Sequence, residues 1–169
     1  IDMFREMRRK RQQMSQAETI EILEKGSFGV LSVYGDDDYP YGVPISYVYD
    51  DGKIYLHCAK TGHKIDGILK NSKVSFCVTA QDLVVPEEYT SYFKSVIAFG
   101  HGRILEKDTE IREAVEKLAL KYYPDDSEEH REAMIEKEYP LLCMIQITID
   151  HVTGKKAIEL VRAEQKNQQ

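Results

Sequence analysis

Three strand-like runs separated by turn residues decide the fold, and they occupy residues 28–58, FGVLSVYGDDDYPYGVPISYVYDDGKIYLHC. We expect strands over 28–34, 39–49 and 53–58, because each run is rich in β-branched and aromatic residues and is bounded by Gly and Asp. The Asp-Gly pair at 51–52 is typical of a tight β-hairpin. The stretch therefore predicts an antiparallel meander.

The rest of the chain adds helices and further strands. In chain order we expect a helix over 15–25 before the meander, and after it a short helix over about 64–70, a strand over 73–80, a loop over 81–89, a strand over 92–105, helices over 109–122 and 127–138, and a strand over 141–149. Ser15 and Glu18 form a capping box for the first helix, and Gly26 ends it. No β–α–β alternation appears, so a doubly wound parallel sheet is not expected. The pattern predicts a mainly β, α+β fold in which six antiparallel strands form a small closed or partly open barrel with flanking helices.

The composition is that of a globular chain with one acidic segment. The 169 residues are 42% hydrophobic and 31% charged, which excludes disorder over the whole length. No apolar run approaches the ~20 residues that a membrane-spanning helix needs, and the net charge of −6 argues against a general nucleic-acid binder. Residues 106–139 carry 12 acidic and 6 basic side chains, so this segment accounts for the whole net charge. We expect neither a membrane nor a nucleic-acid partner.

The cysteines and the first residues indicate a location and a charged surface. Three cysteines, an odd number without a CxxC pair, predict a reduced, cytoplasmic protein. Residues 5–11 hold four arginines and one lysine. This basic opening is either an arm that contacts an anion or a solvated terminus.

The stretch HCAKTGHKID, residues 57–66, has the pattern of an anion site. A strand ends, Ala59 and Gly62 allow a ligand to approach the backbone, and a helix begins beside His63 and Lys64. Free N–H groups at a helix start together with a cation favour phosphate. The alternative is a plain strand–loop–helix connection with exposed Lys and His side chains.

Two strand segments are further candidates. Pro44 within YGVPISY, residues 41–47, cannot donate to a ladder, so the strand is an edge or bulges there. Its unpaired backbone groups would suit a planar heterocycle, although a proline-protected edge strand explains the sequence equally well. Ser95 begins an apolar strand and would point either into a phosphate or ring edge or into an ordinary strand surface. A metal site is not expected, because the candidate ligands lack convincing spacing: His57, Cys58, His63 and His101.

Taken together, these motifs resemble the pyridoxamine 5′-phosphate oxidase-like FMN-binding split-barrel family, and within it the branch related to nitroimidazole-resistance reductases. The resemblance runs from about Met7 to Lys155. The segments that carry it are MRRK (7–10), GVLS (29–32), YPYGVPISY (39–47), HCAKTGHKID (57–66), NSKVSF (71–76), YFKSVI (92–97) and IDHVTGK (149–155). Lys94 stands where relatives often carry an acid, and the oxidase's substrate-binding arginines have no obvious counterpart, so pyridoxamine phosphate is not the expected substrate.

The resemblance implies a six-stranded split barrel that forms a homodimer with FMN in grooves between the subunits. One domain would span 1–156, with 1–14 as a basic arm, and 157–169 would be a partly disordered tail. Pro44 to Tyr47 would line the flavin ring, the loop from His57 to Lys64 would hold the ribityl chain and phosphate, and Ser95 and Val96 would approach from the partner subunit. The implied cofactor-binding residues are Arg8, Arg9, Val43, Pro44, Ile45, Ser46, Tyr47, His57, Ala59, Gly62, His63, Lys64, Ser95 and Val96.

The expected function is an FMN-dependent oxidoreductase that takes electrons from NADH or NADPH and reduces a nitroaromatic or quinone-type electrophile. His57 is the catalytic candidate, because an imidazole titrates near neutrality. The alternative is a flavin- or haem-binding carrier or sensor without turnover, with His57, His63 or His101 as the haem ligand. A structural dimer with an empty groove is a third possibility, against which the intact loop speaks.

Overall fold

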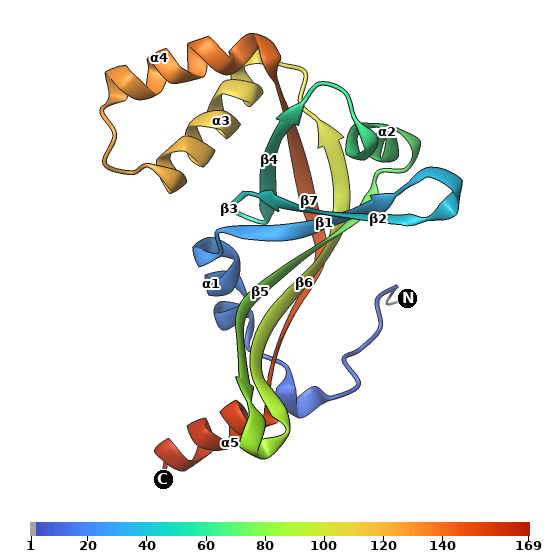
Figure 1. The fold of residues 1–169 in the computed structure, drawn as a ribbon, viewed down its shortest axis with the longest axis vertical. Coiled ribbons are helices and arrows are strands. Elements are labelled where there is room, and N and C mark those ends of the chain that lie inside the picture. Colours follow the sequence, from blue (N-terminus) through green and yellow to red (C-terminus); the bar gives the residue numbers. More distant parts are fainter. Residues whose placement is uncertain (1–2) are drawn as a thin grey trace.

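One antiparallel sheet of seven strands, in the order β2-β1-β5-β6-β7-β4-β3, forms the centre of the molecule (Figure 1). It belongs to a computed structural model that describes residues 3–169. The strands are β1 (Phe28–Tyr34), β2 (Pro40–Ser46), β3 (Val48–Asp50), β4 (Lys53–Ala59), β5 (Lys73–Val85), β6 (Thr90–Ile104) and β7 (Leu142–Lys156). The helices are α1 (Gln16–Lys25), α2 (His63–Lys70), α3 (Asp108–Tyr122), α4 (Glu128–Glu138) and α5 (Ile158–Asn167), and short 3-10 turns lie at Lys10–Gln12, Asp36–Asp38, Pro86–Glu88 and Tyr139–Leu141. The predicted α+β class, an antiparallel sheet with flanking helices, is confirmed.

The predicted count of six strands is wrong, because the run over 39–49 is two strands and not one. It breaks at Tyr47, so that β2 pairs with β1 while β3 pairs with β4, at opposite edges of an open sheet. Tyr47 is completely buried, and its hydroxyl donates to the carbonyl oxygen of Leu23 over 2.7 Å. Its backbone N–H donates to the Tyr122 hydroxyl over 3.1 Å instead of to a neighbouring strand. These bonds outside the ladder end one strand and start the next.

The predicted loop over 81–89 is too long, because residues 81–85 continue β5 and only residues 86–89 form the turn to β6. The ladder between β5 and β6 extends from the Lys73–His101 pair to the Val85–Thr90 pair, with a register shift between Thr79 and Gln81. The outer part of this hairpin projects from the sheet in Figure 1, and its side chains are exposed or only partly buried on both faces. A strand without a buried face loses the alternation by which strands are recognised in sequence.

The main core consists of buried residues of the sheet together with Met14, Leu23 of α1, and Ile65 and Ile68 of α2. Leu31 and Val33 of β1 and Phe76 and Val78 of β5 alternate with more exposed residues, as strands with one buried face should. Helix α1 begins as predicted, since the Ser15 hydroxyl accepts the backbone N–H of Glu18 over 3.2 Å.

The two predicted acidic helices are present as α3 and α4, which form a hairpin beyond one end of the sheet (Figure 1). Ala114 and Leu118 of α3 are buried against Tyr55 and Met144 of the sheet. By contrast, α4 has no buried residue. Lys121 ties α3 to the β2–β3 junction, because its ammonium group donates to the Tyr47 carbonyl over 2.9 Å.

Helix α5 occupies the segment for which a partly disordered tail was expected. Lys156 holds it in place: its side chain is 6% exposed and its ammonium group lies 2.6 Å from the Glu164 carboxylate and 3.0 Å from that of Glu18. The cation thus joins α5 to α1. Within residues 3–169, no helix combines the length and apolar character needed to cross a membrane.

Candidate functional site

The connection from β4 to α2 is an open loop that ends in an uncapped helix start. Gly62 adopts a φ of 144°, and a Cβ built there would meet no atom within 4 Å. The backbone conformation therefore requires glycine while the space around it stays open. No side chain caps α2, and its first internal hydrogen bond runs from the Asp66 N–H to the Gly62 carbonyl over 3.1 Å. The N–H groups of residues 63–65 precede that bond and are available to an anion.

His63 fastens this helix start to the turn between β1 and β2. Its ring stacks on Tyr41 with 4.0 Å between centroids, and its Nε2 accepts the Asp36 N–H over 3.2 Å. With Nε2 engaged as an acceptor, the neutral ring carries its proton on Nδ1. The side chain of His63 thus positions α2, while that of Lys64 is half-buried at the same turn.

Gly67 lets α2 lie directly on β1. A Cβ at this position would come within 2.7 Å of the Tyr34 carbonyl oxygen and of the Val33 side chain. Ile65 and Ile68 are buried on the same side of the helix. The close contact holds the start of α2 in place relative to the sheet.

Strand β2 presents the predicted ring-lining residues at a sheet edge. Its register with β1 is continuous from Ser46–Phe28 to Pro40–Tyr34, so Pro44 lies in an edge strand and not in a bulge. Val43 and Ile45 are half-buried against the core, while Pro44 and Ser46 are exposed on the other face. One side of the β2 backbone therefore stays outside the ladder.

Ser46 and His57 share a cavity of about 480 Å³, although they lie on different strands. On the sheet side it is bounded by these two residues and by Leu142 of β7, and on the other side by α3 and α4. His57 is exposed at its wall. The sequence does not mark the helices as part of the site, because α4 has few apolar residues and both helices have the pattern of a solvated acidic surface. The cavity-lining residues that it missed include Leu118, Tyr122, His130, Arg131 and Met134.

Three other predicted cofactor-binding residues, Arg8, Arg9 and Ser95, do not line the cavity of Ser46 and His57 within one chain. Arg8 and Arg9 are exposed and line a hollow with Ile158 of α5. Figure 1 shows α5 and α2 near opposite ends of the long axis. Ser95 pairs with Lys155, close to where α5 begins.

Two of the predicted residues offer no surface to a ligand. Tyr47 and Val96 are both completely buried. Burial raises the pKa of the Tyr47 phenol, and a lesser contribution comes from the neighbouring Tyr122. We therefore leave these two residues out of the site that we propose below.

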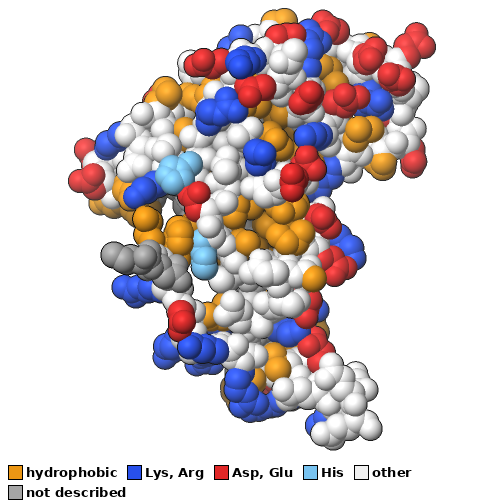
Figure 2. All heavy atoms as spheres, turned by 180° about the vertical axis from the view of Figure 1, so that it is seen from behind, with side chains coloured by type: hydrophobic (Ala, Val, Ile, Leu, Met, Phe, Trp, Pro, Cys, Tyr) orange, Lys and Arg blue, Asp and Glu red, His pale blue; other side chains and the backbone are white. Residues whose placement is uncertain are grey.

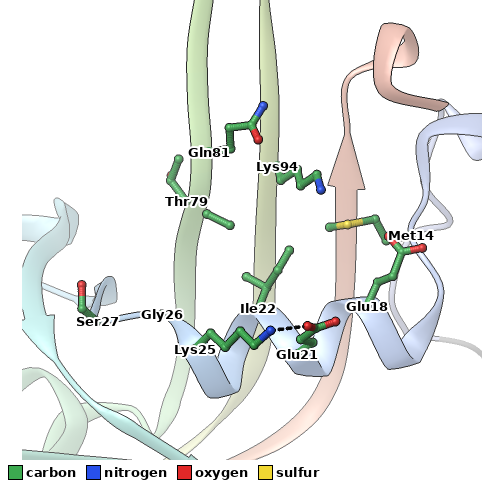
Figure 3. A pocket seen from close by; sticks show the side chains of 11 residues that line it. Met14, Glu18, Glu21, Ile22, Lys25, Gly26, Ser27, Thr79, Gln81 and Lys94 are labelled. Carbon is green, nitrogen blue, oxygen red and sulfur yellow. Dashed lines mark hydrogen bonds and ion pairs between the residues drawn. The ribbon is translucent and has the colours of Figure 1, made fainter. Parts of the chain in front are cut away.

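A second hollow of about 480 Å³ lies between α1 and the β5–β6 hairpin (Figure 3). Figure 3 shows Thr79, Gln81 and Lys94 across from the helix, on which Lys25 and Glu21 form an ion pair of 2.5 Å. None of the predicted cofactor-binding residues lines it.

The outer face of the sheet carries an apolar area next to the N-terminal segment. Ile97 and Phe99 of β6 are 43% and 41% exposed, and they alternate with buried Val96 and Ala98. Phe4 stacks on Phe99 with 5.5 Å between ring centroids. Figure 2 shows exposed hydrophobic side chains on this view of the molecule, with acidic side chains mostly in its upper half and basic ones in both halves.

Comparison with known proteins assigns a family to this geometry. The sequence pattern of the family described as pyridoxamine 5′-phosphate oxidase matches residues 15–156. Among curated proteins, none matches the chain in sequence.

Three solved structures illustrate the shared fold. A protein of Bacteroides thetaiotaomicron described as a candidate 5-nitroimidazole antibiotic resistance protein has 20% identity and a TM-score of 0.72, over 85% of this chain and 86% of that one. An FAD-binding protein from Mesorhizobium loti has 22% identity and a TM-score of 0.62, over 86% and 97% of the two chains. The FAD and heme binding protein from Mycobacterium smegmatis has 17% identity and a TM-score of 0.71, over 86% and 73%.

Proposed function

Because the chain belongs to the pyridoxamine 5′-phosphate oxidase family, we propose that it binds FMN and is an FMN-dependent oxidoreductase. The observation that carries the proposal is the open, uncapped start of α2 beside Lys64. Two structural neighbours are named for FAD binding, which supports a flavin as the cofactor.

The residues fit FMN in the following way. The N–H groups at the start of α2 and the Lys64 ammonium group would bind the phosphate. Ala59 and Gly62 would leave room for the ribityl chain, and the exposed edge of β2 at Pro44 and Ser46 would face the ring. Val43 and Ile45 would support that edge from the core side, and His63 would hold α2 in position.

The bound flavin would supply hydride and electron transfer between a reduced nicotinamide and a small acceptor. A quinone-type or nitroaromatic acceptor gains two electrons and two protons in its first reduction, and NADH or NADPH supplies the electron pair and one of the protons. The other proton would come from His57, which lies exposed at the cavity wall.

We further propose that the site is completed by a second copy of the chain. Arg8, Arg9 and Ser95 lie away from α2 within one protomer, so in a homodimer the partner copy would supply them. The exposed Ile97 and Phe99 give the outer sheet face the apolar character of an interface core. The three cysteines are free thiols, which fits the cytoplasmic location that we propose.

The test is an absorption spectrum of the purified protein before and after anaerobic addition of NADH or NADPH. We expect flavin bands that bleach with one of the two donors. Flavin bands that persist with both would favour a carrier, a Soret band would favour haem, and a colourless protein that takes up no added FMN would contradict the proposal.

Variants test the site itself. We expect Lys64→Ala to weaken FMN binding by roughly 10- to 100-fold, as the loss of a hydrogen bond from a charged group predicts. His57→Ala should also weaken FMN retention. Lys70→Ala is the matched control, because Lys70 is an exposed lysine at the other end of the same helix. Unchanged FMN affinity in both site variants would contradict the assignment.

Sedimentation analysis tests the dimer. We expect the wild-type protein to sediment as a dimer and Ile97→Asp to sediment as a monomer that has lost FMN. A wild-type monomer that binds FMN with full affinity would contradict the two-chain site.

A further inference from the structure

The cavity between the sheet and the α3–α4 hairpin has the size and lining of a small-molecule site. Its volume of about 480 Å³ lies within the usual range for ligand pockets, roughly 300–1,000 Å³. Most of its wall is apolar, contributed by Val115, Leu118 and Ala119 of α3, Met134 and Ile135 of α4, and Leu142 of β7. Such a wall suits the flat body of an aromatic molecule.

Arg131 of α4 lines this cavity and has no hydrogen-bond acceptor for its side chain among residues 3–169. Its side chain is only 11% exposed, and its Nε atom is buried without a partner. The nearest carboxylate oxygen, Oε1 of Glu116, is 3.8 Å from Nη2, which is too long for a hydrogen bond. Leaving a buried donor without an acceptor is costly, so the Nε–H group of Arg131 needs an explanation, even though the guanidinium has a long ion pair with Glu116.

Two other arginines, one on α3 and one on the neighbouring strand β6, have acceptors for their guanidinium groups. Arg112 of α3 donates to the Asp108 carboxylate over 3.1 Å, and Arg103 of β6 donates to Glu110 over 3.1 Å. Both side chains are much more exposed than that of Arg131. Arg131 is therefore the least exposed of these three arginines, and it is also the one whose side chain has no hydrogen-bond acceptor among residues 3–169.

The acidic groups of the cavity do not fill this role. The Asp126 carboxylate is engaged by His130, whose Nδ1 lies 2.8 Å from both of its oxygens. Glu138 is exposed at the end of α4. Among the charged groups of the wall, only Arg131 has a buried donor, its Nε–H group, without an acceptor among residues 3–169.

We propose that this cavity binds a planar aromatic carboxylate, with its ring between α3 and α4 and its carboxylate on Arg131. The planar fork of a guanidinium matches a carboxylate in shape and charge. The inference rests on the proposed function for its role, because Ser46 and His57 belong both to this cavity and to the proposed flavin site. A molecule bound here lies beside the flavin, so the cavity selects aromatic acids among the possible electron acceptors.

Calorimetric titration with two matched probes tests the proposal on the protein as purified. 4-Nitrobenzoate carries the carboxylate, and nitrobenzene has the same ring and nitro group without it. We expect 4-nitrobenzoate to bind at least about 10-fold more tightly, the factor that one hydrogen-bonded charge pair predicts. Arg131→Gln should abolish this preference, and Arg131→Lys should retain part of it.

Two further variants separate the cavity from the rest of the hairpin. Ala119→Phe should weaken both probes, because the larger side chain fills the space where the ring binds. Lys137→Gln changes an exposed residue of α4 outside the cavity wall and should leave both affinities unchanged. Circular dichroism of each variant confirms that the hairpin is folded.

The outcomes distinguish this inference from the proposed function. Equal affinity for the two probes in the wild type, or an unchanged preference in Arg131→Gln, overturns the carboxylate site even if the protein binds FMN. A preference that depends on Arg131 in a protein that takes up no FMN supports the site and contradicts the proposed function.

Discussion

Replacing Tyr47 by Phe removes one hydroxyl from the point where β2 ends and β3 begins. The ring stays, so no cavity forms and the packing of Tyr47 on Phe76 is retained. The lost group is the donor to the Leu23 carbonyl, at 2.7 Å in the buried last turn of α1. Carbonyls in the last turn of a helix have no partner within it, so Leu23 is left with an unsatisfied buried acceptor.

The expected cost follows from that single unsatisfied group. Leaving a buried acceptor without its donor costs about 1–3 kcal/mol. For a domain of this size, each 1 kcal/mol corresponds to a fall in Tm of roughly 2–4 °C. We therefore expect Tyr47→Phe to lower the free energy of unfolding by about 2 kcal/mol, without a change in the urea m-value.

Urea unfolding followed by circular dichroism measures this difference, and the chain provides a matched control. The Tyr49 hydroxyl accepts the Gly52 N–H over 3.1 Å in the β3–β4 turn, where water can replace it. Tyr49→Phe should therefore cost no more than about 0.5 kcal/mol. Equal losses in the two variants would refute the argument that Tyr47 splits the strand through a buried hydrogen bond.

Three further changes test other contacts. Gly67→Ala should destabilise the protein by about 1–3 kcal/mol in urea unfolding and weaken FMN retention, because the new Cβ would meet the β1 backbone at 2.7 Å. Burial, with a lesser contribution from Cys143, raises the pKa of the Cys58 thiol from 9.0 to about 11, so iodoacetamide should label it slowly in the folded protein. The folded state keeps this proton where the unfolded state has lost it, so stability should fall as the pH rises from 9 to 11. Lys156→Met removes the cation that joins α5 to α1, and hydrogen exchange should show lost protection in α5.

Each of these three changes has a control. Gly42→Ala is the control for Gly67→Ala: the nearest atom to its new Cβ would be Val30 Cγ1 at an ordinary 3.4 Å, so stability should not fall. Cys58→Ser should remove only the label that peptide mapping assigns to residue 58, because Cys77 and Cys143 are also free thiols. For Lys156→Met, exchange in β6 should be unchanged, and protection that persists in α5 would contradict the role given to the lysine.

Local signals were sufficient for most elements and for part of the candidate site. The cap at Ser15, the turn before β4 and the glycine of the β4–α2 loop depend on residues within a few positions of one another. The sequence alone therefore located α1 to α4, strands β1 and β4 and the open loop before Lys64, but not α5 or the separate strand β3. The edge position of β2 was one of two alternatives that Pro44 left open, because a missing N–H does not say which strand lies beside it.

Only the tertiary structure decided the features that depend on distant partners. The strand break at Tyr47 rests on Leu23 and Tyr122, and the long β5–β6 arm is a strand because the two segments pair with each other and not because either has a buried face. The cavity beside His57 exists because α3 and α4 close over the end of the sheet, and its buried guanidinium belongs to a helix whose sequence is that of a solvated surface. Burial is a property of what the rest of the chain places around a residue, and the residue's neighbours in sequence do not determine it.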